Sequence, residues 1–168
     1  MRHPIVVDTN VLVVANGGPA HTRKCAANCS AELMKIRESG QVVLDYGYEI
    51  LKEYGNNQKA TTGQPGVGFL FWKWLLDTRA GAEHCVRVTI KKGGARGYEE
   101  FPDHDDLSKF DFADRKFVAV AIVHGGRPPI LQAVDTKWWG WKDALQECGV
   151  EVKFLCKEEI KAKFESAR

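Results

Sequence analysis

Short apolar runs alternate along the chain with longer segments of helical pattern, and this alternation limits the folds open to the sequence more than any other feature. The runs that predict strands are IVVDT (5–9), QVVLDYG (41–47), CVRVTI (85–90), PILQAVD (129–135) and VEVKFL (150–155). Helices are expected at about 21–38, 48–55, 67–80, 111–126, around 142–148 and at the charged C-terminus. Strands that alternate with helices indicate a parallel sheet covered on both faces. We therefore expect an α/β fold with three layers, α/β/α, around a central parallel sheet.

Length and composition favour one domain over residues 1–168. The chain has 168 residues, 44% of them hydrophobic, and a net charge of +2. This is enough to bury a sizeable core and leaves little room for a second domain. The polar segment at 56–66 and the connection at 91–109 predict loops, the latter basic at its start and acidic at its end.

The sequence argues against a membrane protein and against a secreted disulfide scaffold. Asp8 and Asn10 interrupt the N-terminal apolar run, and the longest later run, FVAVAIV at 117–123, is too short to span a bilayer. The cysteines are five, an odd number, without a CxxC pair or a regular spacing. A reducing compartment is the default for such a pattern, and we expect a cytoplasmic protein.

Four acidic residues fall at positions where an α/β sheet gathers ligands. Asp8 and Asp135 end predicted parallel strands, Asp114 lies in the first turn of a helix, and Glu53 lies on a helix that begins just after a strand. A buried, unpaired Asp8 is costly, so it needs a partner or a cation. Carboxylates brought together raise one another's pKa unless a divalent cation neutralises them. Hard oxygen ligands of this kind favour Mg²⁺ or Mn²⁺.

Four segments resemble the PIN-domain nucleases in the order that family has them. They are VVDTNVL (6–12), YEILKEY (48–54), DFADRKFVAVAIVHGG (111–126) and AVDTKWW (133–139). The resemblance leaves out a divergent helix and loop region at about 56–106. It implies a PIN-like fold in which Asp8, Glu53, Asp114 and Asp135 are the catalytic, metal-binding set. Asn10 would be a supporting residue.

By this resemblance the chain is expected to be an Mg²⁺- or Mn²⁺-dependent endonuclease that hydrolyses phosphodiester bonds in RNA. The alternatives are a catalytically weak or inactive PIN-like module that binds RNA or a protein partner, and the toxin of a toxin–antitoxin pair. A homodimer and an antitoxin or other protein partner also stay open. Ala133 and Lys137 depart from the family, which often has Thr or Ser at the first position and an acid at the second.

Other acids near this set have competing interpretations. Asp111 is expected to be a supporting residue of the site. In the competing interpretation, Asp111 and Asp114 together resemble a capping box and only hold the start of a helix. Glu49 and Glu53 lie one turn apart, and Glu53 falls closer to the apolar arc of its helix, which favours it as the ligand. Asp45 and the acids between 103 and 106 are expected to be solvated loop charges.

Basic, sulfur and aromatic side chains complete the set of candidates. The residues expected to hold a nucleic-acid backbone are Lys91, Lys92, Arg96, Arg115 and Lys116. A stripe of His21, Cys25 and Cys29 could bind zinc, but with no fourth ligand in view, packing of the thiols in the core is favoured. The tryptophans at 138, 139 and 141 fit base stacking and core packing equally well.

Overall fold

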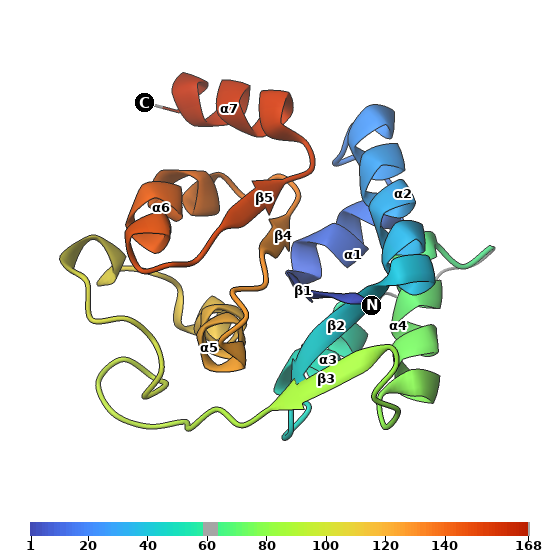
Figure 1. Ribbon diagram of the computed structural model, residues 1–168. Helices are drawn as coiled ribbons and strands as arrows, with labels where there is room; N and C mark the ends of the chain where they lie inside the picture. Colours follow the sequence, from blue (N-terminus) through green and yellow to red (C-terminus); the bar gives the residue numbers. More distant parts are fainter. Residues whose placement is uncertain (59–63, 168) are drawn as a thin grey trace.

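A five-stranded parallel sheet forms the centre of the protein, as seen in a computed structural model that describes residues 1–58 and 64–167 (Figure 1). The strands are β1 (His3–Val7), β2 (Gly40–Asp45), β3 (Cys85–Val88), β4 (Ile130–Gln132) and β5 (Val152–Phe154). Their order is β3-β2-β1-β4-β5, and every neighbouring pair is parallel. The predicted three-layer α/β/α fold is confirmed.

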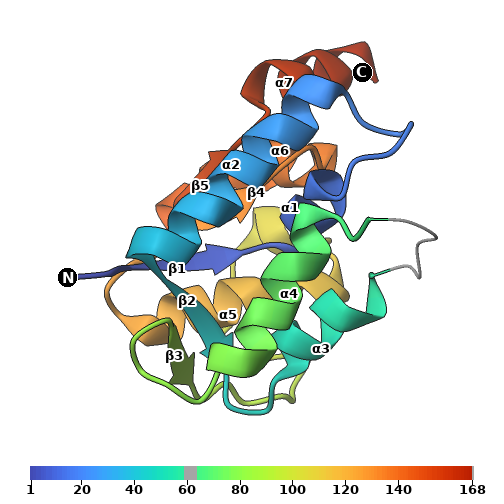
Figure 2. The same ribbon diagram turned by 90° about the vertical axis from the view of Figure 1, so that its right-hand side faces the viewer.

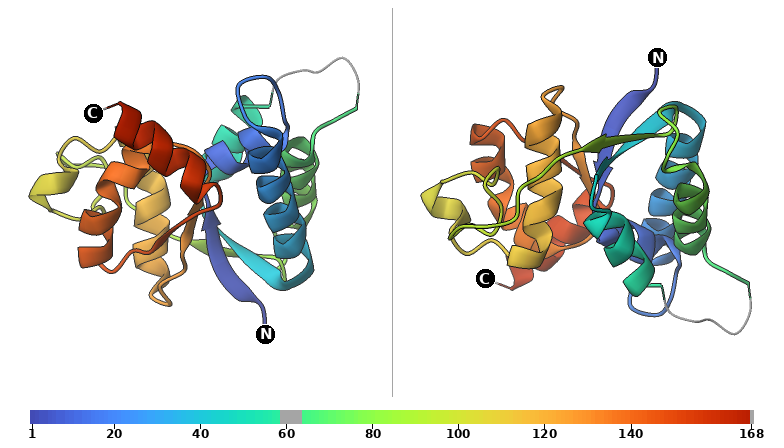
Figure 3. Two further views of the ribbon diagram at one scale, coloured as in Figure 1. Left: turned by 90° about the horizontal axis from the view of Figure 1, so that it is seen from above. Right: turned by 90° about the horizontal axis from the view of Figure 1, so that it is seen from below.

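Helices cover both faces of this sheet. They are α1 (Thr9–Ala15), α2 (Arg23–Ser39), α3 (Glu49–Asn56), α4 (Val67–Thr78), α5 (Arg115–His124), α6 (Thr136–Glu147) and α7 (Lys157–Ser166). Figure 2 looks onto the face where α2 and α4 lie over the strands. Helix α5 lies on the opposite face and contacts β1, β2, β3 and β4 (Figure 3). The C-terminal helix α7 packs on α6.

The strands are buried on both sides, which explains their nearly continuous apolar runs. Val42, Val43 and Leu44 follow one another in β2 and none of them is exposed. Successive side chains of a strand point to opposite faces, so such a run needs cover on both. Every residue of α5 from Arg115 to Ala121 is buried as well, so this helix runs through the core and not along the surface.

Most element boundaries agree with the sequence to within a few residues, with two larger differences. Helix α1 was not among the predicted helices, and the strand predicted at 5–9 ends two residues earlier, at Val7. Helix α6 begins at Thr136, six residues before the predicted helix around Lys142. Its first turn is started by Asp135, whose carboxylate accepts a hydrogen bond from the Lys137 backbone N–H at 3.0 Å. From the sequence Asp135 is predicted only as a ligand, so its role as the cap of α6 is a finding of the structure.

Two long connections were predicted as loops. Between β3 and α5 the chain forms an isolated antiparallel bridge, Lys92 with Tyr98, and two short 3₁₀ turns, Asp105–Leu107 and Phe112–Asp114. Of the segment at 56–66, residues 59–63 lie outside the described part of the chain. No helix within the described ranges is long and apolar enough to cross a membrane.

Candidate active site

The order of the strands places two of the predicted acids side by side. From β1 the chain builds outward through β2 and β3, then returns to the other side of β1 with β4 and β5. The direction of winding therefore reverses between β1 and β4, and the carboxyl ends of strands at such a reversal are where open α/β sheets bind ligands. Asp8 directly follows β1, and Asp135 follows β4 by three residues.

Local hydrogen bonds fix the backbone around both acids. Asp8 caps α1, with its Oδ2 atom accepting from the Asn10 N–H at 2.9 Å. The Asn10 side chain reaches across to the segment after β4, where its Oδ1 atom accepts from the Val134 N–H at 2.9 Å. Asn10 thus connects the Asp8 turn with the Asp135 turn, which fits the supporting position expected for it.

Asp8 is buried, and one of its carboxylate oxygens makes no hydrogen bond of normal geometry within the described residues. Asp8 is 5% exposed to solvent. Burial, then the charges of Asp114 and Glu53, raise the pKa of Asp8 to about 8, while the Asn10 N–H and the Gln132 side chain oppose this rise. Among the described residues, neither Asp8 Oδ1 nor Gln132 Nε2 makes a hydrogen bond of normal geometry. An unsatisfied buried oxygen of this kind calls for a ligand.

Asp114 faces the same region from the start of α5. It occupies the N-cap position, but its side chain makes no capping hydrogen bond. Burial raises the pKa of Asp114 to about 6. A long hydrogen bond from Trp138 Nε1, at 3.4 Å, opposes this, and the charges of Glu53, Asp135 and Asp111 add to it. Burial also raises the pKa of Asp135.

Glu53, and not Glu49, points toward the other acids. Glu49 is exposed, whereas the Glu53 carboxylate accepts a hydrogen bond from the Thr9 hydroxyl. Its Oε1 atom lies 2.6 Å from Lys116 Nζ, with the two side chains 23% and 10% exposed. Lys116 also donates to the Ala113 carbonyl. One acid of the four therefore already has a cationic partner inside the protein.

The four acids share one electrostatic environment without forming a compact ligand shell. Within the described part of the chain, no three of their carboxylate oxygens lie within 4.8 Å of one another. Their oxygen atoms have the chemistry that Mg²⁺ or Mn²⁺ prefers, and in the described part of the chain Asp8 Oδ1 makes no hydrogen bond of normal geometry. The residues fit a hard divalent cation by donor type, with Asp8, Asp114 and Asp135 as the acids not held by a lysine.

Two further acids differ from what the sequence indicated. Asp111 does not complete a capping box, because its side chain makes no cap bond and instead pairs with exposed Lys137 at 3.0 Å. Asp45 is not a solvated loop charge. It is 1% exposed, and its two oxygens accept from the backbone N–H groups of Glu49 at 2.8 Å and Ile50 at 3.0 Å. Asp45 therefore holds the start of α3, which carries Glu53.

The five predicted phosphate-binding cations separate into two groups. Arg115 is 3% exposed and donates to backbone carbonyls, with its Nη2 atom 2.8 Å from the Phe110 oxygen. Arg115 and Lys116 are committed to internal partners, which argues against their predicted contact with a phosphate backbone. Arg96 is half-buried and donates to the Phe101 carbonyl at 2.8 Å. Lys91 and Lys92 are exposed.

Of the three tryptophans of α6, Trp138 lies in the core and Trp141 packs against it, while Trp139 is partly exposed. Trp138 is fully buried and packs edge-on against Phe110 at 5.0 Å between ring centroids. Trp141 packs on the same ring at 4.4 Å, and Trp139 packs on Phe154 at 5.0 Å. These contacts favour the core interpretation over base stacking.

Two polar residues of the site were missed by the sequence analysis. Thr9 contacts Glu53 through its hydroxyl, and Gln132 places its amide nitrogen beside Asp8 while its amide oxygen accepts from the Ala133 N–H. Thr9 stands next to Asp8 in the DTN motif, and Gln132 is the one polar residue in the apolar run ILQAV. Both positions carried a signal, since a polar side chain at the end of a buried strand needs a partner.

The cysteines overturn one expectation. Cys25 and Cys156 form a disulfide across 131 residues, whereas reduced thiols were predicted. The pairing has no local sequence signal, because only the fold brings β5 and the start of α7 next to α2. Burial, with a smaller contribution from Glu159, raises the pKa of the neighbouring Cys29 to about 12.

Comparison of the chain with models of protein families, with curated proteins and with solved structures finds no match.

Proposed function

We propose that this protein is a metal-dependent endonuclease that hydrolyses phosphodiester bonds, with RNA as its substrate and Mg²⁺ or Mn²⁺ as its cofactor. The observation that carries the proposal is buried Asp8 at the carboxyl end of the central strand, whose Oδ1 atom makes no hydrogen bond of normal geometry within the described residues. The charges of Asp114 and Glu53 act on the same carboxylate. The resemblance to PIN-domain nucleases supplies the reaction and the substrate class.

In this proposal Asp8, Asp114 and Asp135 hold the cation. A bound divalent ion supplies an activated water and stabilises charge on the phosphate and the leaving oxygen. The capping hydrogen bonds of Asp8 and Asp135 orient their carboxylates. Asn10 keeps the two turns together. These residues thus preorganise the negative charge that a divalent ion requires.

Glu53 and Lys116 have a different part. Their ion pair, at 2.6 Å, neutralises one of the four acids and places an ammonium group beside the others. Lys116 would then limit the total negative charge of the site and would hold Glu53 in place. Exposed Lys91 and Lys92 follow β3 at the same edge of the sheet and are the cations free to contact a phosphate backbone.

The same ion pair favours a second candidate, a PIN-like module that binds RNA or a protein partner without cleaving it. An internal ammonium can take the place of a metal in compensating buried carboxylates. Ala133, which is fully buried and has no hydroxyl, is consistent with this alternative.

Cleavage of a mixed RNA substrate separates the two candidates. The parent protein is expected to cleave with Mg²⁺ or Mn²⁺ and to stop with EDTA, and Asp114→Asn is expected to be inactive. Glu53→Gln should lose most activity, while Glu49→Gln, one turn away with an exposed side chain, is the matched control and should retain it. Metal-independent cleavage, or full activity of Asp114→Asn, contradicts the nuclease proposal. A parent that binds RNA without cleaving it supports the module.

A further inference from the structure

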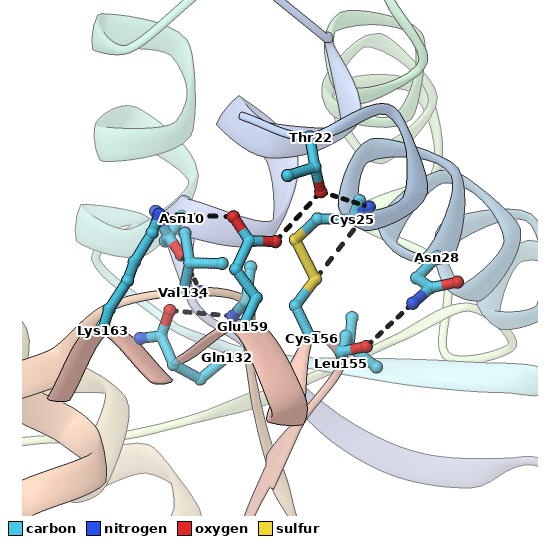
Figure 4. The surroundings of a disulfide bond; sticks show 11 residues. Asn10, Thr22, Cys25, Asn28, Gln132, Val134, Leu155, Cys156, Glu159 and Lys163 are labelled. Atoms are coloured by element: carbon cyan, nitrogen blue, oxygen red, sulfur yellow. Dashed lines mark hydrogen bonds and ion pairs between the residues drawn. A yellow bond between two sulfur atoms is a disulfide. The ribbon is translucent and has the colours of Figure 1, made fainter. Parts of the chain in front are cut away.

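Three buried cysteines meet where the start of α7 lies against α2. Cys25 and Cys29 lie one turn apart on α2, and Cys156 is the N-cap residue of α7. Their sulfur atoms all lie within 4.8 Å of one another. Figure 4 shows the disulfide that joins Cys25 to Cys156, with Thr22 and Glu159 beside it. This is the one such group of potential ligands found in the described residues, and it does not include His21.

We propose that reduction of the Cys25–Cys156 disulfide creates a binding site for a thiophilic cation, Zn²⁺ or Cu⁺, with Cys25, Cys29 and Cys156 as its ligands. The zinc stripe considered from the sequence lacked ligands from another element. The fold supplies Cys156 from the far end of the chain, so the sulfurs come from two separate helices. Thiolates are the ligands that select these soft and borderline cations over Mg²⁺.

The sulfurs are surrounded by charged groups of both signs, with Lys24 and Lys157 lining the adjoining pocket beside the acids. The carboxylate of Glu159 acts on Cys29 and is held by two partners. Its Oε2 atom accepts from the Thr22 hydroxyl at 3.0 Å, and its Oε1 atom lies 3.3 Å from Lys163 Nζ (Figure 4). All three cysteines are buried, so a bound ion would be shielded from water. A pocket of about 430 Å³ lined by Cys25, Cys156 and Glu159 adjoins the disulfide and gives a route to it.

The two states of the site exchange two electrons. A dithiol reductant gives two electrons and two protons to the disulfide, which becomes two thiols. The reductant itself is oxidised to a disulfide. The cation then replaces thiol protons, which pass to solvent. In the oxidised state the sulfur–sulfur bond joins α2 to α7, and in the reduced state the cation does so. The C-terminal helix is therefore attached to α2 in both.

Cd²⁺ is a direct probe of this site, because thiolate ligands give it an ultraviolet charge-transfer absorption that carboxylates do not. The protein is reduced with a dithiol, freed of the reductant without air, and titrated with Cd²⁺. The parent is expected to bind one equivalent with the thiolate absorption and to gain thermal stability. Cys29→Ser should weaken binding by more than about tenfold, the loss that even an outer partner of a metal ligand causes.

Cys148→Ser is the matched control, since Cys148 is a free cysteine outside the cluster. It should bind Cd²⁺ as the parent does. The unreduced parent should show no thiolate absorption at one equivalent. The proposal is overturned if the reduced parent shows no thiolate absorption with Cd²⁺, a result that needs no variant. It is also overturned if Cys29→Ser binds Cd²⁺ with the parent's affinity. Neither result bears on the nuclease proposal, because the readouts do not involve RNA.

Discussion

The ammonium nitrogen of Lys116 lies 2.6 Å from Oε1 of Glu53, inside the group of acids that the sequence suggests as a metal site. Both side chains are largely buried, so each neutralises the charge of the other in a place that solvent does not reach. Lys116 approaches from α5 and Glu53 from α3. The pair therefore also joins two helices that start at the carboxyl edge of the sheet.

Replacing Lys116 should leave the negative charge of the site without its internal cation. Lys116→Met leaves Glu53 without its cation beside Asp8 and Asp114, and we expect a loss of about 2 kcal/mol in the free energy of unfolding in EDTA. Added Mn²⁺ should recover more of this loss than it adds to the parent. Denaturant unfolding measures both values. Lys137→Met, at an exposed ion pair, is the control and should change little. An unaffected Lys116→Met would show that the buried pair is not needed to balance the acids.

The pH dependence of stability should reveal the buried Asp8. Because its pKa is about 8 in the folded protein and 3.8 ordinarily, the folded state binds the extra proton between these values. The free energy of unfolding in EDTA should therefore fall as pH rises from about 4 to about 8, by up to about 1.4 kcal/mol per pH unit from this group. The pKa of Asp114 is raised to about 6, so this group also lowers the free energy of unfolding as pH rises from about 4 to about 6.

Asp8→Asn separates the two acids. Asn retains the capping acceptor of α1 and removes the titrating group, so the slope above pH 6 should flatten. Chemical unfolding at a series of pH values in EDTA gives this slope. A variant with the parent's slope would assign the effect to other groups.

Lys91 and Lys92 should affect nucleic-acid binding without affecting the fold. Their joint replacement by Glu is expected to weaken RNA binding and to reduce the slope of log K against log salt by about 1 or more, since fewer counterions are released. The matched control is the pair Lys35→Glu and Lys153→Glu. These exposed lysines line a depression near the start of β1, at the opposite edge of the sheet. Equal effects of the two pairs would indicate a response to net charge alone.

Arg115 should matter for stability and not for salt dependence. Its guanidinium satisfies backbone carbonyls of the connection before α5 and lies over the Phe101 ring at 4.3 Å. Arg115→Met leaves those buried acceptors unpaired, and a loss of about 3 kcal/mol is expected in thermal or denaturant unfolding. A folded variant of unchanged stability with weakened RNA binding would restore the phosphate-binding role predicted from the sequence.

The sequence predicted the layers and the strand positions because both depend on local patterns. Runs such as Val42 to Leu44 are readable as strands buried on both faces, and their alternation with helices predicts a parallel sheet. The position of Asp8 and Asp135 at one edge of the sheet follows from the same rule, since parallel strands end at one edge. The helical period was also enough to predict that Glu53, rather than exposed Glu49, lies on the inner side of its helix.

Properties that depend on contacts between distant segments could not be predicted in this way. Asp45 looked like a loop charge because its partners are backbone N–H groups, which carry no residue identity. The basic residues of α5 looked free because the sequence does not show that this helix is buried all round. The Cys25–Cys156 bond joins residues whose separation of 131 gives no pattern.

The central claim is that a divalent cation compensates the acids at the carboxyl edge of the sheet, and thermal scans of Asp135→Asn test it most directly. Asn retains the cap of α6 that Asp135 provides through Lys137 N–H, so the substitution changes the charge and little else. Without metal, removal of one of several neighbouring carboxylates relieves repulsion, so Tm in EDTA should rise above that of the parent. Added Mn²⁺ should raise Tm of the parent by more than that of the variant, because a ligand bound to the folded state stabilises it. A lower Tm of Asp135→Asn in EDTA, together with equal responses of the two proteins to Mn²⁺, would contradict the claim.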